Sequence, residues 1–237
     1  MLLCASYSDI GGRKANEDSV AVFSDGNANL CAALADGLGG HGGGDAASDT
    51  VVNTVIDGWA PGGGAQMLAQ LVSLANERVL AMQSDACKMK STIAALSVEG
   101  PYVAWAYVGD SRLYRFEGGA LAWQSKDHSA SQLSVIMGQI TPDQIRTDDG
   151  RGMLYKVVGQ EEDLRPETGS LVAQNNAYVF LLCSDGFWEY VLEEDMVRTL
   201  AQSRTPNEWI ALMRGIHDHR CSQTCDNNSA ITVWLTV

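Results

Sequence analysis

Four aspartates occur where the chain enters or leaves predicted buried strands. They are Asp36, Asp110, Asp185 and Asp226. Antiparallel neighbours bring the end of one strand beside the start of the next, so we expect these carboxylates to meet at one edge of a single core. Carboxylates that converge in a partly buried place repel one another unless cations neutralise them. A ligand set made only of oxygen favours the hard ions Mg²⁺ and Mn²⁺ over Zn²⁺.

The stretch around Asp36 suits a bound ion or phosphoryl group. The apolar residues 30–35 predict a short buried strand that ends at this aspartate. Six glycines then occur between positions 37 and 44, and a chain without side chains can bring its backbone close to a ligand. A helix of small residues is expected to follow from Asp45. The pattern is typical of the floor of a cation or phosphate site. The alternative is a flexible surface loop with an ordinary aspartate.

A polar connection, residues 9–18, precedes the second predicted strand. Its Arg13 is a fork-shaped donor that can hold a phosphate at two points, and Glu17 and Asp18 supply adjacent carboxylates. The alternative is an exposed hairpin with surface charges. Two ions roughly 3.5–4 Å apart would activate a bridging water and hold a phosphoryl oxygen. The predicted chemistry is hydrolysis of a phosphoester by in-line attack of water, with no covalent enzyme intermediate.

Alternating and helical apolar patterns divide the chain into strands and helices. We expect strands at residues 2–8, 19–24, 30–35, 92–98, 102–108, 112–116, 121–123, 170–173, 177–183 and 230–237. Helices are expected at residues 46–56, 65–82, 193–203 and 206–220. The strands between 92 and 123 are predicted to form one antiparallel meander with Asp110 in a short turn. Residues 126–165 are irregular and predict an excursion beside the site.

The composition is that of one globular domain. The chain has 237 residues, of which 46% are hydrophobic, and its formal charge of −13 would repel nucleic acids and anionic membranes. No apolar run approaches the ~20 residues of a membrane helix, and the N-terminus lacks a secretory signal.

The six cysteines lack the spacing of a disulfide framework, which predicts buried free thiols and a cytoplasmic location. No heptad pattern indicates a partner subunit, so we expect a monomer.

Five short motifs occur in order along the whole chain. They are Arg13-x-x-Asn16-Glu17-Asp18, Asp36-Gly37-x-Gly39-Gly40-His41, Gly109-Asp110-Ser111-Arg112, Ser184-Asp185-Gly186 and Asp226-Asn227. In order and spacing the chain resembles the metal-dependent serine/threonine protein phosphatases of type 2C, and in particular their bacterial members. The resemblance implies an α+β fold, a four-layer α-β-β-α sandwich with two central antiparallel sheets flanked by helices. It also implies one catalytic domain over residues 1–237, with a flap at about residues 128–160.

The resemblance further implies hydrolysis of phosphoserine and phosphothreonine by a water that bridges two Mn²⁺ or Mg²⁺ ions. Asp36 would bridge the two ions, and the carbonyl of Gly37 would bind the second. Asp185 and Asp226 would hold the first ion. The implied partners are a phosphorylated protein substrate and a cognate serine/threonine kinase.

Five further residues receive roles from the same resemblance. Glu17 and Asp18 would act mainly through metal-bound waters, and Asp110 would help to hold a third, weaker ion. Arg13 would bind the phosphate of the substrate. His41 is a candidate proton donor to the leaving oxygen, with a structural role in the glycine turn as the alternative.

Three other interpretations stay open. A catalytically weak type 2C-like binding or regulatory protein would keep the fold, although such members usually lose an aspartate that this chain retains. His217, Cys221 and Cys225 are spaced i, i+4, i+8, which on a helix would align two thiols with an imidazole for Zn²⁺. The alternative there is a helix end with a surface histidine and free thiols. A phosphodiesterase that acts on small molecules would use the same metals as a phosphatase.

Overall fold

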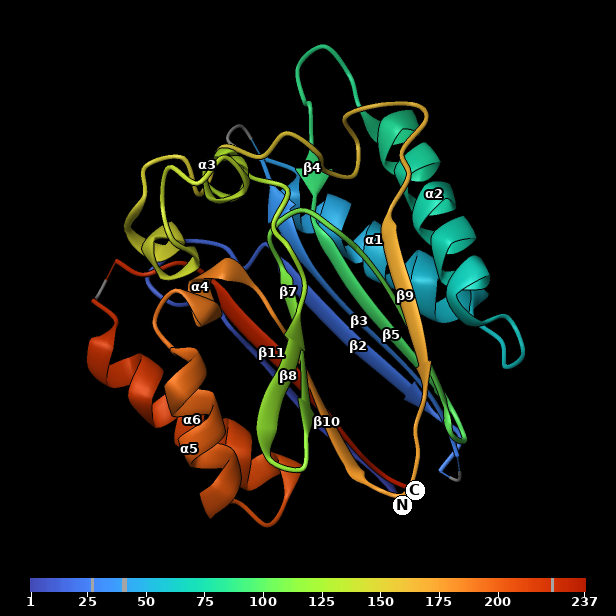
Figure 1. The fold of residues 1–237 in the computed structure, drawn as a ribbon. Coiled ribbons are helices and arrows are strands. Elements are labelled where there is room, and N and C mark those ends of the chain that lie inside the picture. Colours follow the sequence, from blue (N-terminus) through green and yellow to red (C-terminus); the bar gives the residue numbers. More distant parts are fainter. Residues whose placement is uncertain (27, 40–41, 223) are drawn as a thin grey trace.

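The computed structural model describes residues 1–26, 28–39, 42–222 and 224–237, and two antiparallel sheets form its centre (Figure 1). The first sheet has the order β1-β11-β10-β7-β8. Its strands are β1 (Leu2–Asp9), β7 (Arg112–Glu117), β8 (Ala120–Gln124), β10 (Ala177–Cys183) and β11 (Asn228–Thr236). The second sheet has the order β2-β3-β5-β6-β9, and β4 pairs with β3. Its strands are β2 (Asp18–Ser24), β3 (Asn29–Leu38), β4 (Lys90–Ser91), β5 (Ile93–Glu99), β6 (Tyr102–Val108) and β9 (Glu167–Val172).

Helices cover the outer faces of both sheets (Figure 1). The second sheet is covered by α1 (Gly44–Gly58) and α2 (Gly64–Met82). The first sheet carries α4 (Asp185–Trp188), α5 (Glu193–Gln202) and α6 (Pro206–Arg220). Among the described residues, no helix has both the length and the apolar character needed to cross a bilayer.

Three apolar clusters fill the spaces between the four layers. Successive side chains of a strand point to opposite faces of its sheet, and β3 is apolar on both faces. Its Ala33 and Ala35 pack against α1 and α2, whereas Ala32 and Leu34 pack into the space between the sheets. A third cluster lies between the first sheet and α4 to α6. The predicted four-layer sandwich is therefore confirmed.

The predicted single meander over residues 92–123 is wrong at one point. β5 pairs with β6 and β7 pairs with β8, but β6 and β7 belong to different sheets. The chain crosses between the sheets through Gly109, Asp110 and Ser111. Gly109 has a φ of +97°, and a Cβ at this position would lie 2.6 Å from the side chain of Thr92. The crossing places Asp110 between the sheets instead of in an exposed hairpin turn.

The α6 helix begins and ends where its sequence signals predict. The side chain of Thr205 accepts a hydrogen bond from the backbone N–H of Glu208, and Pro206 occupies the first turn. The helix ends at Arg220, and beyond it Cys221 and Cys225 form a disulfide with their Cα atoms 5.9 Å apart. The prediction of free thiols is wrong for this pair because the turn after α6 brings the two residues together. The other cysteines are free, namely Cys4, Cys31, Cys87 and Cys183.

The long connection between β8 and β9 contains α3 (Ala130–Ile136) and a 3₁₀ helix, Pro142–Thr147. It lies over one end of the sandwich, near β4 (Figure 1). Ser131 Oγ donates to Asp148 Oδ2 at 2.6 Å, and this bond joins the two halves of the excursion. A function of this segment as a flap stays a prediction.

Candidate metal centre

The residues predicted to bind metal and phosphate gather around one hollow. Its volume is about 990 Å³. The predicted site residues that line it are Arg13, Glu17, Asp36, Gly37, Asp185 and Asp226. Three of the four aspartates that we expected to meet at one edge of the core, Asp36, Asp185 and Asp226, thus lie around the same hollow.

Strand register explains why these carboxylates meet. In the second sheet, β2 and β3 pair so that Asp18 lies opposite Asp36. In the first sheet, Cys183 at the end of β10 lies opposite Ala230 near the start of β11. Asp185 follows β10 and Asp226 precedes β11, so both stand at the same end of that sheet. The two sheets therefore deliver their acids to one edge.

Asp18 lies beneath the hollow. Its side chain is buried, and Ser184 Oγ donates to its Oδ2 at 2.8 Å. Its Oδ1 has no hydrogen-bond partner among the described residues. Burial is the main cause that raises the pKa of Asp18 to about 7, and the nearby carboxylates of Asp185 and Asp226 contribute to this rise. The structure thus gives Asp18 an inner position that the sequence did not indicate.

Asp110 is also buried, at the crossing between the two sheets. Its backbone carbonyl accepts a hydrogen bond from Trp188 Nε1 at 2.9 Å. Burial raises the pKa of its carboxyl group, with Asp185 as the next cause. Asp110 therefore lies within electrostatic reach of the hollow without lining it.

The carboxylates that line the hollow repel one another, and nearby cationic side chains do not neutralise them fully. Burial raises the pKa of Asp36, and the neighbouring Asp185 adds to the effect. Burial raises the pKa of Asp185 to about 6, with Glu189 and Asp226 as further causes. Asp185 Oδ1 has no hydrogen-bond partner within the described part of the chain. Oxygen atoms without partners, in a set that repels itself, fit divalent hard cations.

Arg13 is not free to bind phosphate in this state. Its guanidinium group forms an ion pair with Asp226 Oδ2. Both side chains are partly exposed, 56% for Arg13 and 41% for Asp226, and such a pair contributes only about 0–1 kcal/mol. A cation that takes Asp226 as a ligand would therefore release Arg13 at little cost.

Three polar residues that position the site were missed by the sequence reasoning. Asn227 Nδ2 donates to the carbonyl groups of Ile10 and Ala15, at 2.8 and 2.9 Å, and its Oδ1 accepts from the backbone N–H of Glu17 at 2.8 Å. This amide holds the loop of Arg13 and Glu17 against the start of β11. The other two residues are Ser184, which binds Asp18, and Thr92, whose Oγ1 accepts from the backbone N–H of Asp36. Asn227 and Ser184 lie next to metal-ligand candidates in the motifs, which is the signal that could have identified them.

Gly186 allows two site loops to touch through their backbones. A Cβ at this position would lie 2.1 Å from the carbonyl oxygen of Asn227. The loop of Asp185 and the loop of Asp226 are therefore fixed against each other by close contact, which any larger residue would force apart.

His41 and Gly40, both parts of the predicted glycine turn, lie outside the described residues. The assignment of His41 as a proton donor stays a prediction.

The comparisons with known proteins agree with this geometry. The model of the family described as Protein phosphatase 2C matches residues 7–208. The chain belongs to the protein phosphatase 2C family. It is 33% identical over 209 residues to the serine/threonine protein phosphatase PstP of Mycobacterium tuberculosis, a match that covers 84% of this chain and 39% of PstP. The chain thus spans less than half of the length of that relative.

Solved structures of the family superpose over nearly the whole chain. Stp1, the serine/threonine phosphatase of Staphylococcus aureus, has a TM-score of 0.87 at 26% identity and covers 100% of this chain and 96% of its own. The catalytic domain of PstP in complex with two manganese ions has a TM-score of 0.82 at 28% identity. This match covers 98% of our chain and 97% of that domain. The resemblance inferred from the five motifs is confirmed at the level of the family and the fold.

Proposed function

We propose that the chain is a protein serine/threonine phosphatase that hydrolyses phosphoserine and phosphothreonine by direct attack of water, with two Mn²⁺ or Mg²⁺ ions as cofactors. The observation that supports this most is the set of carboxylates around one hollow, with raised pKa values and oxygen atoms that lack partners. When bound, two divalent ions supply an activated water and stabilise the charge on the phosphoryl oxygens.

The proposed ligands are those that the family resemblance implies, and they line the hollow. Asp36, the Gly37 carbonyl, Asp185 and Asp226 would hold the two ions. These residues line the hollow from three different segments of the chain. Their backbone is fixed by the sheets and by the contact at Gly186, so the ligands are held in place before the ions bind.

Three further acidic residues would adjust the charge around the proposed ligands. Glu17 lines the hollow, and burial raises the pKa of its carboxyl group. Asp18, oriented by Ser184, would add a carboxyl group beside the proposed ligands. Asp110 is proposed to help to hold a third ion.

Arg13 would bind the substrate phosphate. Its bond to Asp226 competes with this role until cations occupy the carboxylates. The guanidinium group would then bind two phosphoryl oxygens, which orients the phosphorus for attack by water. Arg13 is exposed on the rim of the hollow, so a phosphorylated side chain of a protein can reach it.

A phosphothreonine peptide provides the test. We expect hydrolysis with Mn²⁺, none with EDTA, and a loss of about 1,000-fold or more in kcat for Asp185→Asn, since that substitution removes several kcal/mol of transition-state stabilisation. Asp163→Asn is the matched control, because Asp163 is 80% exposed in a surface ion pair; it should retain wild-type activity. Turnover that survives EDTA, or that Asp185→Asn leaves unchanged, would contradict the proposal. Calorimetric binding of Mn²⁺ without turnover would support a binding or regulatory protein in its place.

A phosphorylated protein is the proposed substrate, with a cognate serine/threonine kinase as the functional partner. The monomeric state and the cytoplasmic location stay predictions from the sequence. Size-exclusion chromatography with light scattering checks the first, and fractionation of cells checks the second.

A further inference from the structure

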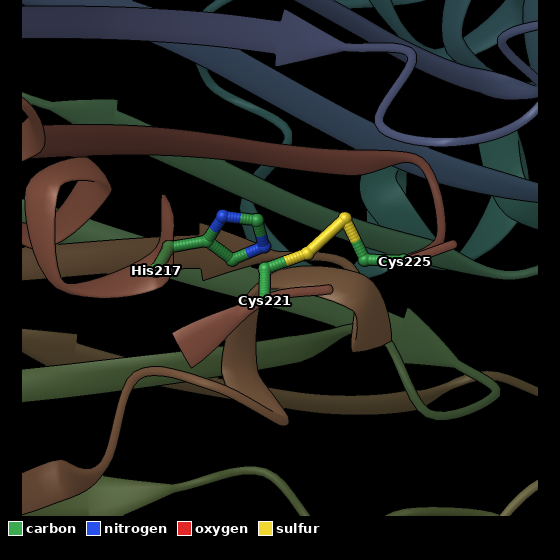
Figure 2. A group of neighbouring side chains, drawn as sticks. All are labelled: His217, Cys221 and Cys225. Carbon is green, nitrogen blue, oxygen red and sulfur yellow. A yellow bond between two sulfur atoms is a disulfide. The ribbon is translucent and has the colours of Figure 1, made fainter. Parts of the chain in front are cut away.

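A second cluster of candidate metal-ligating side chains lines a separate hollow, which shares Gly12 with the carboxylate hollow. His217, Cys221 and Cys225 each place a ligand atom within 4.8 Å of the others (Figure 2). Figure 2 shows the imidazole ring beside the two sulfur atoms, which are joined in the disulfide. The cluster contains one nitrogen and two sulfur ligands, a set that favours Zn²⁺ over Mg²⁺.

The backbone brings the two cysteines together. The N–H of Cys221 donates to the carbonyl of His217 at 2.8 Å, as the last bond of α6. The N–H of Cys225 donates to the carbonyl of Ser222 at 3.2 Å, and its own carbonyl accepts from Gly12 at 2.9 Å. None of these bonds involves sulfur. The backbone contacts that bring the two residues together therefore do not depend on the S–S bond.

His217 is held in the manner of a metal ligand. Its side chain is buried, stacks against Phe187 with 6.2 Å between ring centroids, and meets Tyr190 edge-on. Its Nε2 lies 3.0 Å from the carbonyl oxygen of Gly186, and its Nδ1 lies 3.1 Å from Asp218 Oδ1. Both oxygens accept hydrogen bonds, whereas a neutral imidazole has one N–H to donate. In the neutral form one nitrogen therefore donates to an oxygen, as in most zinc-bound histidines, and the other faces an oxygen with its lone pair, a contact that a bound cation would replace.

A hollow in front of the cluster gives an ion access. Its volume is about 370 Å³, and His217, Cys221 and Cys225 line it together with Asp9 and Asp218. Zn²⁺ with three protein ligands takes a water or a carboxylate as its fourth. Either can be supplied from this hollow.

We propose that His217, Cys221 and Cys225 form a Zn²⁺ site in the reduced chain. A dithiol reductant transfers two electrons and two protons to the Cys221–Cys225 disulfide and becomes a disulfide itself. The two thiols then lose their protons as one Zn²⁺ binds between the thiolates and the imidazole. A disulfide oxidant takes two electrons back from the thiolates, the S–S bond forms again, and Zn²⁺ leaves.

Co²⁺ provides a test with its own optical signature. Thiolate ligands give Co²⁺ a sulfur-to-metal charge-transfer absorption that a carboxylate site cannot give. We expect the reduced full chain to show this absorption with one equivalent of Co²⁺, and one equivalent of Zn²⁺ to remove it. The oxidised chain should show none. Absence of the absorption from the reduced chain would overturn the proposal.

Variants identify the ligands. The absorption should disappear in the Cys221→Ser, Cys225→Ser double variant and persist in Cys87→Ser, the matched change at a free cysteine. Asp218→Asn should lower the affinity for Co²⁺ by about 10- to 100-fold, since it removes the orienting carboxylate. An absorption that survives in the double variant would assign the metal to other thiols and refute the site. The wild-type chain in its two redox states decides the matter even if a variant does not fold.

Discussion

The chain contains two groups of buried acidic side chains that differ in the source of their positive charge. In one group, Arg112 donates from Nε and Nη2 to the two oxygens of Asp127, at 2.9 and 2.7 Å, and both side chains are almost fully buried. Arg146 donates to Glu193 at 2.6 Å in the same network. In the other group, the carboxylates of the candidate metal centre face one another, and Arg13 pairs with the partly exposed Asp226. The chain provides buried cations in the first group, whereas Asp185 Oδ1 in the second has no hydrogen-bond partner among the described residues.

The directions of the pKa shifts record this difference. Burial alone would raise the pKa of Glu193, but Arg146, a backbone hydrogen bond and Arg112 together outweigh burial and the pKa is lowered. Burial raises the pKa values of Asp36 and Asp110, with Asp185 as the next cause, and for Asp110 the opposing effect of Arg112 does not outweigh burial. A buried acid with a raised pKa in a hollow therefore marks a binding site, and one with a lowered pKa marks a structural pair.

The largest expected effect is on catalysis. Asp36→Asn should lower kcat by about 1,000-fold or more with Mn²⁺, because it removes the proposed bridging ligand. In EDTA its free energy of unfolding should equal or exceed that of the wild type, since the substitution removes a charge that its neighbours repel. Peptide hydrolysis and urea unfolding measure the two quantities. A clear loss of stability in EDTA would place Asp36 among the structural acids.

The same substitution in the other group should affect stability instead. Asp127→Asn leaves the buried guanidinium of Arg112 without its carboxylate and should lower the free energy of unfolding by about 3 kcal/mol or more. The exposed pair of Asp163 and Arg165 is the control, where Asp163→Asn should change stability by less than about 1 kcal/mol. Urea unfolding of both variants makes the comparison. Equal effects would remove the distinction between buried and exposed pairs.

A further effect is a pH dependence of stability in the metal-free chain. The pKa of Asp18 is raised from 3.8 to about 7 on folding. Between these values the folded state binds more protons, so the contribution of Asp18 to stability is full below pH 4 and is lost as the pH rises through 7. The difference in unfolding free energy between the wild type and Asp18→Asn in EDTA should fall over this range. His128, with its pKa lowered to about 4 by burial, has the opposite dependence, but it cancels in the difference. A difference in unfolding free energy that does not change with pH would refute the raised pKa of Asp18.

Much of the fold could be predicted because its signals are local. Strands, helix ends and the aspartates beside glycines follow from alternation, capping and turn residues, as at Thr205 and Pro206. The crossing at Gly109 could not be predicted, since a turn of three residues fits a hairpin as well as a change of sheet. What decides it is the pairing of β7 with β10, which is a contact between distant parts of the sequence.

The sequence motifs predicted acidic residues that line the hollow, but not the polar groups that position them. The motifs identified Asp36, Asp185 and Asp226, but the inner position of Asp18 depends on the register of β2 with β3 and on Ser184. The Arg112–Asp127 pair joins residues on either side of a hairpin, and the sequence gives no local sign of it. The grouping of His217 with the cysteines was considered for a continuous helix, whereas the chain achieves it by a turn after Arg220.

Trp188 separates the two groups of acids. The guanidinium of Arg112 lies 3.5 Å from the centre of its ring, and its Nε1 donates to the backbone of Asp110. The emission of a buried indole shifts when the charge near its ring changes. The arrival of divalent ions at the carboxylates would therefore be reported by a chromophore that the chain already contains, and occupancy of the centre could be followed by fluorescence without any label.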